Sequence, residues 1–200
     1  MTSSTACISS FKLASEFLPH PEDELGESGL SWGRFRLLVD GRDLFVRSGS
    51  EEGGMEWNLC HLWDFIEEGI YGPNGEDLDS EDWRSALDYA TRLDHILYFW
   101  DDEDRVEHER ERRSWIREKN LACIGQGTTA PSIYIVVDEG RGYVEMSWNQ
   151  KENYLRGWMT PPTNVLRLSL PHFEDAIEAF RREYREFIVS NVPRSLRRDL

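Results

Sequence analysis

The feature of this 200-residue chain that most constrains its fold is a run of five β-branched and aromatic residues, Ile133–Val137. Residues of these two kinds favour strands because their side chains pack well on a pleated surface. The polar, glycine-containing segment 138–142 predicts a turn, 143–148 is expected to return as a second strand, and 165–170 is predicted as a further strand. This part of the chain must therefore contribute a sheet.

A second hairpin is predicted near the N-terminus. Apolar and polar residues alternate over 30–39, which is the pattern of a strand with one buried face. Asp40 and Gly41 tolerate the positive φ angles of a tight turn, so 44–47 is expected to be the returning strand. Segment 11–17 is predicted as another short strand.

Apolar residues at three- and four-residue spacing predict amphipathic helices over 59–70, 80–97 and 173–188. The last of these has the most regular apolar stripe, with acidic residues near its N-terminal end and arginines in its second half, as the helix dipole favours. Segment 101–119 differs, because its 8 acidic and 6 basic residues leave few apolar ones. It is predicted as a solvated helix that packs through its C-terminal end.

The order of these elements predicts an α+β fold, with an antiparallel sheet built from β-hairpins and amphipathic helices packed on it. Segments 149–164 and 191–200 are expected to be irregular. The length fits a single domain, 1–200, with sub-lobes over 1–104 and 105–200 as a finer hypothesis.

The net charge of −15 is distributed unevenly. Residues 1–104 carry 24 acidic and 7 basic residues, whereas 105–200 carry 14 and 16. Such a chain repels phosphate backbones, so no direct nucleic-acid binding is expected. A basic protein partner is favoured instead, because opposite potentials accelerate association. The alternative is that the acidity serves solubility alone.

Location and redox state are predicted from what the chain lacks. No apolar run approaches the roughly 20 residues needed to cross a bilayer, and 1–10 has no basic residue ahead of an apolar run. We therefore expect a cytoplasmic protein without membrane contact, as a monomer or a homodimer. Cys7, Cys60 and Cys123 have no paired spacing, so no disulfide framework is expected.

Two acidic segments are the candidate partner-binding site. The first follows a run of aromatic residues, and aromatic anchors beside carboxylates suit the capture of Arg and Lys side chains. The second resembles a calcium loop superficially, without the central Gly and distal Glu of an EF-hand. The alternative for the first segment is a helix end followed by a run of solvated charges, and the alternative for the second is the acidic start of a helix. The candidate residues are Tyr98, Trp100, Asp101, Asp102, Glu103, Asp104, Glu76, Asp77 and Asp79.

No cofactor or metal is expected. The G-x-G-x-x-A match at 125–130 is followed by a proline and a strand, where a dinucleotide site needs a helix, and the five histidines show no zinc spacing. A small-molecule pocket near Gly125, Gly127, Pro131 and Trp148 remains an alternative hypothesis. The common hydrolase and kinase signatures are absent, so we do not expect an enzyme and assign no catalytic residue, although a hydrolase with unpatterned carboxylates stays open.

Three segments together resemble a domain that accompanies zinc metallopeptidases of the ImmA/IrrE type: 59–63, 115–127 with Pro131 after it, and 144–148. The resemblance spans 30–150 and lacks the peptidase signature. It implies a recognition or scaffold domain of bacterial conflict or phage-defence systems. The uneven charge distribution, together with the absence of catalytic motifs, leads to the hypothesis of an immunity or antitoxin protein that neutralises a basic toxin by occlusion. The alternative is a ligand-sensing or scaffold component of a phage-defence system.

Overall fold

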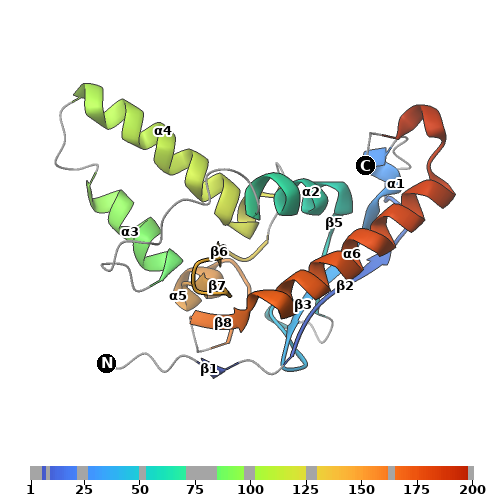
Figure 1. Ribbon diagram of the computed structural model, residues 1–200, viewed down its shortest axis with the longest axis horizontal. Coiled ribbons are helices and arrows are strands. Elements are labelled where there is room, and N and C mark those ends of the chain that lie inside the picture. The colour runs from blue at the N-terminus through green and yellow to red at the C-terminus, as the bar shows by residue number, and fades with distance from the viewer. Residues whose placement is uncertain are drawn as a thin grey trace.

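Two four-stranded sheets and a set of helices make up the described part of the protein (Figure 1). The predicted α+β class is therefore confirmed. The computed structural model describes residues 6–7, 10–21, 27–49, 53–70, 85–96, 102–124, 130–161 and 165–197.

The first sheet contains the predicted C-terminal hairpin. Its strand order is β1-β8-β7-β6, antiparallel except that β1 adds to β8 in parallel. The strands are β1 (Ala6–Cys7), β6 (Ile133–Asp138), β7 (Tyr143–Trp148) and β8 (Val165–Ser169).

Strand β6 is an uninterrupted apolar run because both of its faces are covered. Ile133 and Ile135 face the main core, whereas Tyr134 and Val136 belong to a second cluster with α3 (Ala86–Ile96). A strand buried on both sides needs no alternation of apolar and polar residues.

The second sheet is built around β3 (Trp32–Val39). Strand β2 (Phe11–Phe17) pairs along one side of β3, and β4 (Arg42–Asp43) and β5 (Met55–Asn58) pair along the other. Strand β3 alternates strictly between buried and partly exposed residues, as predicted.

The turn after β3 is confirmed, but the predicted returning strand 44–47 is wrong. Asp40 and Gly41 have φ angles of 48° and 74°. Strand β4 then ends at Asp43, because the Oδ1 atom of Asp43 accepts the backbone N–H of Phe45 at 2.8 Å and turns the chain.

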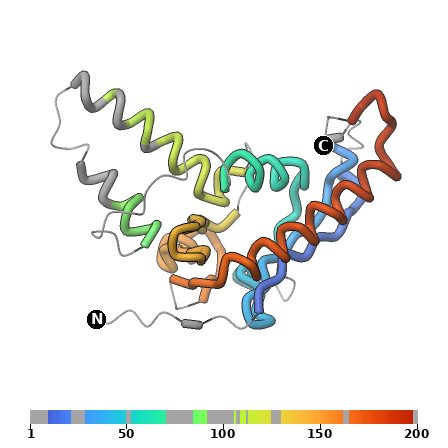
Figure 2. The backbone as a smooth tube through the Cα atoms, in the orientation of Figure 1, coloured from blue at the N-terminus to red at the C-terminus, as the bar shows by residue number. Residues whose placement is uncertain are grey.

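The helix α6 (Leu170–Asn191) carries the predicted apolar stripe and covers β2. Phe173 stacks on Phe11 with ring centroids 5.6 Å apart, and Phe187 stacks on Phe17 at 3.6 Å. Figure 2 shows this C-terminal helix, in red, beside the blue N-terminal strands. One cluster of buried side chains therefore includes residues from both halves of the chain.

The charged segment forms α4 (Asp102–Lys119), which extends away from the sheets toward its N-terminal end (Figure 1). Its C-terminal end contacts β6 and the π-helix η1 (Phe65–Ile70). There Trp115 stacks on Tyr134 at 5.7 Å, whereas Val106 is 60% exposed. The prediction of a solvated helix that packs through its C-terminal end is confirmed.

The remaining helices are short. The prediction that 149–164 is irregular is wrong, since α5 begins one residue after Asn149, whose side chain accepts the N–H groups of Lys151 and Glu152. The helix predicted from residue 80 is described from Ala86 onward. The short helices are α1 (Glu27–Leu30), α2 (Leu59–Asp64), η2 (Leu121–Cys123), α5 (Gln150–Leu155) and η3 (Arg194–Leu196).

Among the described residues, no helix has both the length and the apolar character that a membrane span requires.

Candidate functional site

The acidic residues predicted from the sequence fall at one end of α4. Asp102, Glu103 and Asp104 are the first three residues of the helix, and acidic residues are in general favoured at a helix N-terminus. The other candidate residues lie outside the described residues, so their role stays a prediction: Tyr98, Trp100, Asp101, Glu76, Asp77 and Asp79.

The opposite end of α4 is fixed by a buried lysine. Lys119 is 1% exposed, and its Nζ atom donates to the carbonyl oxygen of Gly69 at 2.6 Å. Desolvation by burial lowers the pKa of Lys119, an effect partly opposed by the carboxylate of Glu118. A Cβ atom on Gly69 would lie 2.5 Å from the Glu118 carbonyl oxygen, so glycine permits this close contact. The direction of α4 is therefore set by tight packing at its C-terminal end.

The residues of the predicted pocket are placed in part. Trp148 is fully buried, and its indole N–H donates to the carbonyl oxygen of Pro161 at 3.1 Å. Pro131 is buried as well, and Gly125 and Gly127 lie outside the described residues. A pocket at this position stays a prediction.

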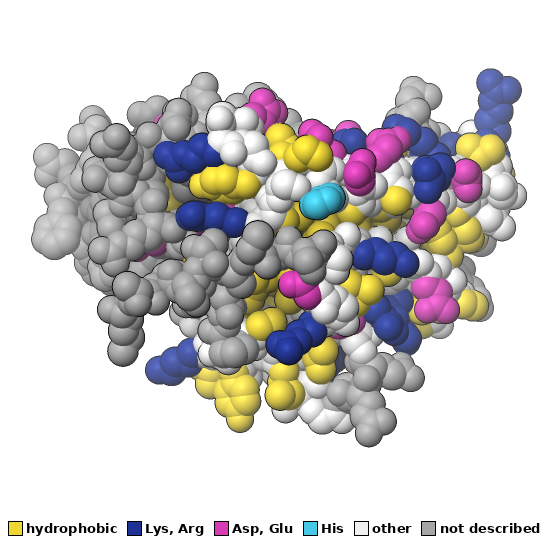
Figure 3. Space-filling view, turned by 60° about the horizontal axis from the view of Figure 1, so that its bottom comes forward, with side chains coloured by type: hydrophobic (Ala, Val, Ile, Leu, Met, Phe, Trp, Pro, Cys, Tyr) yellow, Lys and Arg dark blue, Asp and Glu magenta, His cyan; other side chains and the backbone are white. Residues whose placement is uncertain are grey.

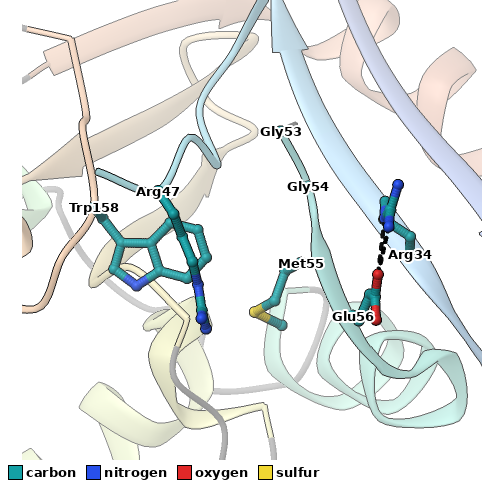
Figure 4. Close-up of a pocket in the computed structure, with 7 residues that line it drawn as sticks. All are labelled: Arg34, Arg47, Gly53, Gly54, Met55, Glu56 and Trp158. Atoms are coloured by element: carbon teal, nitrogen blue, oxygen red, sulfur yellow. Dashed lines mark hydrogen bonds and ion pairs between the residues drawn. The ribbon is translucent and has the colours of Figure 1, made fainter. Parts of the chain in front are cut away.

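A cleft of about 340 Å³ lies where the second sheet meets the segment after α5 (Figure 4). This volume is within the range of small-molecule sites. The cleft is lined by Arg34, Arg47, Gly53, Gly54, Met55, Glu56 and Trp158.

One wall of the cleft is a stacked arginine and tryptophan. The backbone of 46–48 runs beside 157–159. The N–H of Met159 donates to the carbonyl oxygen of Val46 at 2.7 Å, and the N–H of Ser48 donates to the carbonyl oxygen of Gly157 at 2.9 Å. This pairing holds the guanidinium of Arg47 over the Trp158 ring, 5.0 Å from its centroid. The contact is a cation–π interaction that orients the planar guanidinium.

The other wall is an ion pair across two strands. Arg34 of β3 lies opposite Glu56 of β5, and the Nε and Nη2 atoms of Arg34 donate to Glu56 Oε1 at 3.1 and 2.5 Å. Gly54 has a φ angle of 99°, and a Cβ atom there would lie 2.8 Å from Arg34 Cγ. Glycine is therefore required where the chain passes over Arg34.

A partly buried carboxylate lies beside the cleft. A Cβ atom added to Gly53 would lie only 2.0 Å from Asp43 Oδ2, so the backbone of Gly53 packs directly against the Asp43 side chain. Burial raises the pKa of Asp43, although the backbone N–H of Phe45 and the guanidinium of Arg36, 3.8 Å away, oppose the effect. The cleft therefore combines two arginines with fixed acidic neighbours. Arginine side chains in this setting suit carboxylate or phosphate groups.

Within the described ranges, no group of three or more His, Cys, Asp or Glu side chains is placed to hold a metal ion. No protein-family model matches the chain, and no curated protein or solved structure matches it either.

The cleft residues were not identified from the sequence. Arg47 and Trp158 meet through pairing between distant segments, which leaves no local pattern. The adjacent glycines Gly53 and Gly54 were the one local signal, because paired glycines often mark a backbone passing close to another group.

Proposed function

We propose that this chain is an acidic protein-binding module of a bacterial conflict system, an immunity or antitoxin protein that neutralises a basic toxin or effector by occlusion. The observation that carries the proposal is the mounting of α4. Buried Lys119 and stacked Trp115 fix its C-terminal end, and Asp102–Asp104 form its far end. An acidic segment carried by a helix that is fixed at its other end can orient a basic partner through complementary charge.

The distribution of charge along the sequence supports the same proposal. Acidic residues outnumber basic ones by 24 to 7 over 1–104. On the face shown in Figure 3, the described basic and acidic side chains are interspersed with hydrophobic ones. The acidic excess is therefore not concentrated among the described residues of that face. The resemblance to a domain of bacterial conflict proteins favours a role in defence or immunity.

The first test identifies the partner and measures its association. A tagged chain is purified from its native host, and co-purifying proteins are identified by mass spectrometry. Expression of the partner alone should arrest growth, and co-expression with this chain should restore it. The on-rate of the purified pair should fall about tenfold between roughly 50 and 300 mM salt. A growth-neutral partner, or an on-rate that does not change with salt, contradicts the proposal.

A matched pair of charge variants localises the interaction. The triple substitution Asp102→Asn, Glu103→Gln and Asp104→Asn should lower the on-rate at low salt about three- to fivefold. The control neutralises three exposed acids elsewhere, at Glu139, Glu174 and Glu186, and should change it less than about twofold. Equal effects of the two variants contradict the role of α4.

A second candidate function is a ligand-sensing or scaffold component of a phage-defence system, and the cleft favours it. Arg47 over Trp158 and Arg34 beside Glu56 would bind a small carboxylate or phosphate. A thermal-shift screen of such compounds should find one that raises Tm, and Arg47→Met should remove the shift. A shift of equal size in Arg47→Met assigns the ligand to another site.

A further inference from the structure

The strand β2 has an open backbone edge. Asp40 N–H donates to the Ser10 carbonyl, and Leu18 N–H donates to the Trp32 carbonyl, so the pairs 10/40 and 18/32 are hydrogen-bonded pairs of the β2–β3 ladder. Antiparallel ladders alternate, so residues 12, 14 and 16 also bond toward β3. The N–H and C=O groups of the intervening residues point away from β3. These residues are Phe11, Leu13, Ser15 and Phe17.

Nothing in the described ranges pairs with this edge. Strand β2 is terminal in its sheet, and its register with β3 is unbroken over all 7 residues, without a bulge or a proline. Natural sheets usually protect such an edge, since it is a template for another strand. Only Lys12 and Glu16 are charged within β2, and both belong to the face opposite buried Leu13.

A groove of about 380 Å³ lies between α6 and the first part of β2, where Ser10, Phe11, Lys12 and Leu13 line it. The stacked pairs Phe11–Phe173 and Phe17–Phe187 show that α6 and β2 run in the same direction. Six strand steps cover about 20 Å and fourteen helix steps about 21 Å, so the two elements stay aligned. The α6 side of the groove consists of His172, Asp175, Ala176, Ala179 and Glu183.

This alignment places each groove residue beside a position of β2. Asp175 lies near the level of Phe11, because it follows by two residues Phe173, which stacks on Phe11. Glu183 lies at the level of Ser15, whose hydroxyl donates to Glu183 Oε2 at 3.1 Å. Ala176 and Ala179 lie between them, at the level of Leu13, and their small side chains leave the groove open.

The two acids match the repeat of an extended chain. Asp175 and Glu183 are about 12 Å apart along the helix axis, and side chains four residues apart on a strand are about 13 Å apart. An added strand would therefore place basic side chains opposite Phe11 and Ser15 and a small apolar side chain opposite Leu13. The acids favour basic side chains at the two outer positions. Lys12 also lines the groove, although its position in β2 belongs to the face opposite Leu13, and His172 lies at the end near Phe11.

We propose that the free edge of β2 binds an extended segment of a partner protein as an added antiparallel strand, with the pattern basic-x-small apolar-x-basic facing α6. Backbone hydrogen bonds from the β2 edge hold the segment, and Asp175 and Glu183 select its basic side chains. The inference rests on the proposed function in one respect, namely that the partner is a basic protein.

The probe is the peptide acetyl-TKTVTKT-amide, whose symmetric sequence keeps both lysines and the valine on one face. It is titrated into the ¹⁵N-labelled full chain and followed by the amide signals of residues 11, 13, 15 and 17. The same peptide N-methylated at the valine and both lysines loses the ladder donors and should bind at least about tenfold more weakly. The peptide with glutamates in place of both lysines should bind at least about fivefold more weakly.

Two protein variants at one position separate the backbone from the side chain. Ser15→Pro removes an N–H that points away from β3, and proline is tolerated on edge strands. Ser15→Ala keeps that N–H and loses the hydroxyl contact with Glu183. Ser15→Pro should weaken peptide binding about tenfold relative to Ser15→Ala. If Ser15→Pro does not fold, the comparison of parent and N-methylated peptides on the native chain decides.

Neutralising the groove acids tests selection. Asp175→Asn with Glu183→Gln should weaken the lysine peptide about fivefold, and the control Glu139→Gln with Glu174→Gln should not. Equal binding of the parent and N-methylated peptides overturns the inference. So does a dimer in analytical ultracentrifugation that Ser15→Pro dissolves, because the edge then belongs to a second copy. A native partner that depends on Asp102–Asp104 but not on Ser15→Pro also overturns it and leaves the proposed function standing.

Discussion

The buried carboxylate of Glu145 is the charge on which we expect the first sheet and α3 to depend most. Glu145 is 1% exposed on β7. Its Oε1 atom accepts the backbone N–H of Ala86, at the start of α3, at 2.7 Å. Its Oε2 atom accepts from Nε and Nη2 of Arg167 at 3.0 and 2.8 Å. The Glu145 side chain therefore connects the start of α3 with the strands β7 and β8.

The substitution Glu145→Gln keeps the shape and removes the charge. Its amide can present oxygen to Ala86 or to Arg167, but its NH₂ group then faces a donor on the other side. Breaking a fully buried ion pair costs about 3–5 kcal/mol. Arg167 is 35% exposed and can be partly hydrated, so we expect a smaller loss of about 2–3 kcal/mol. For a chain of this length, that loss lowers Tm by about 4–12 °C.

Urea unfolding followed by tryptophan fluorescence and circular dichroism measures the loss. The control is Glu152→Gln, which breaks an exposed ion pair with Arg156 of 2.8 Å and should cost at most about 1 kcal/mol. If both variants unfold at the same urea concentration, the buried carboxylate does not contribute as the geometry implies.

Two further substitutions test other contacts. Gly69→Ala should push η1 away from α4, because the new Cβ atom would lie 2.5 Å from the Glu118 carbonyl oxygen. We expect the free energy of unfolding, measured in urea, to fall by at least about 2 kcal/mol. The control Gly140→Ala should change it little, since its nearest contact would be 3.7 Å. Asp43→Asn tests a pH effect. The folded-state pKa of Asp43 is raised above 3.8, so the wild type should gain stability relative to the variant as pH falls from 7, with the gain complete below about 3.8. A stability difference that stays constant from pH 7 to 4 contradicts this account.

Elements with local signals were predictable from the sequence, and contacts between distant segments were not. The β6–β7 hairpin and the stripe of α6 depend on residues close together in the chain, and both were predicted correctly. Helix α5 has six residues, of which Asn153 alone is buried, so it presents no apolar stripe. The side-chain amide of Asn153 instead pairs with the backbone of Ser132. Its Oδ1 atom accepts the Ser132 N–H at 2.8 Å, and its Nδ2 atom donates to the Ser132 carbonyl oxygen at 3.1 Å.

The candidate sites follow the same division. Helix α4 was predictable because acidic and basic residues recur at i, i+4 spacing over 101–119, whereas the role of its acidic first residues stays a prediction. The cleft depends on Arg47 meeting Trp158, and the groove depends on β2 lying beside α6, contacts between residues far apart in the chain. Pairing of this kind is set by the tertiary fold, so composition and periodicity do not report it.

The packing of β2 against α6 has a consequence for synthesis on the ribosome. Ser15 and Glu183 are in contact across 168 positions, so the apolar face of β2 emerges long before the helix that covers it. At about 5–20 residues per second, that interval lasts roughly 8–35 s, during which Phe11, Leu13 and Phe17 have no native cover. We therefore expect a nascent chain stalled before α6 to expose this apolar face to chaperones and to aggregation, and we expect the face to be covered once α6 has been synthesised and packs on β2.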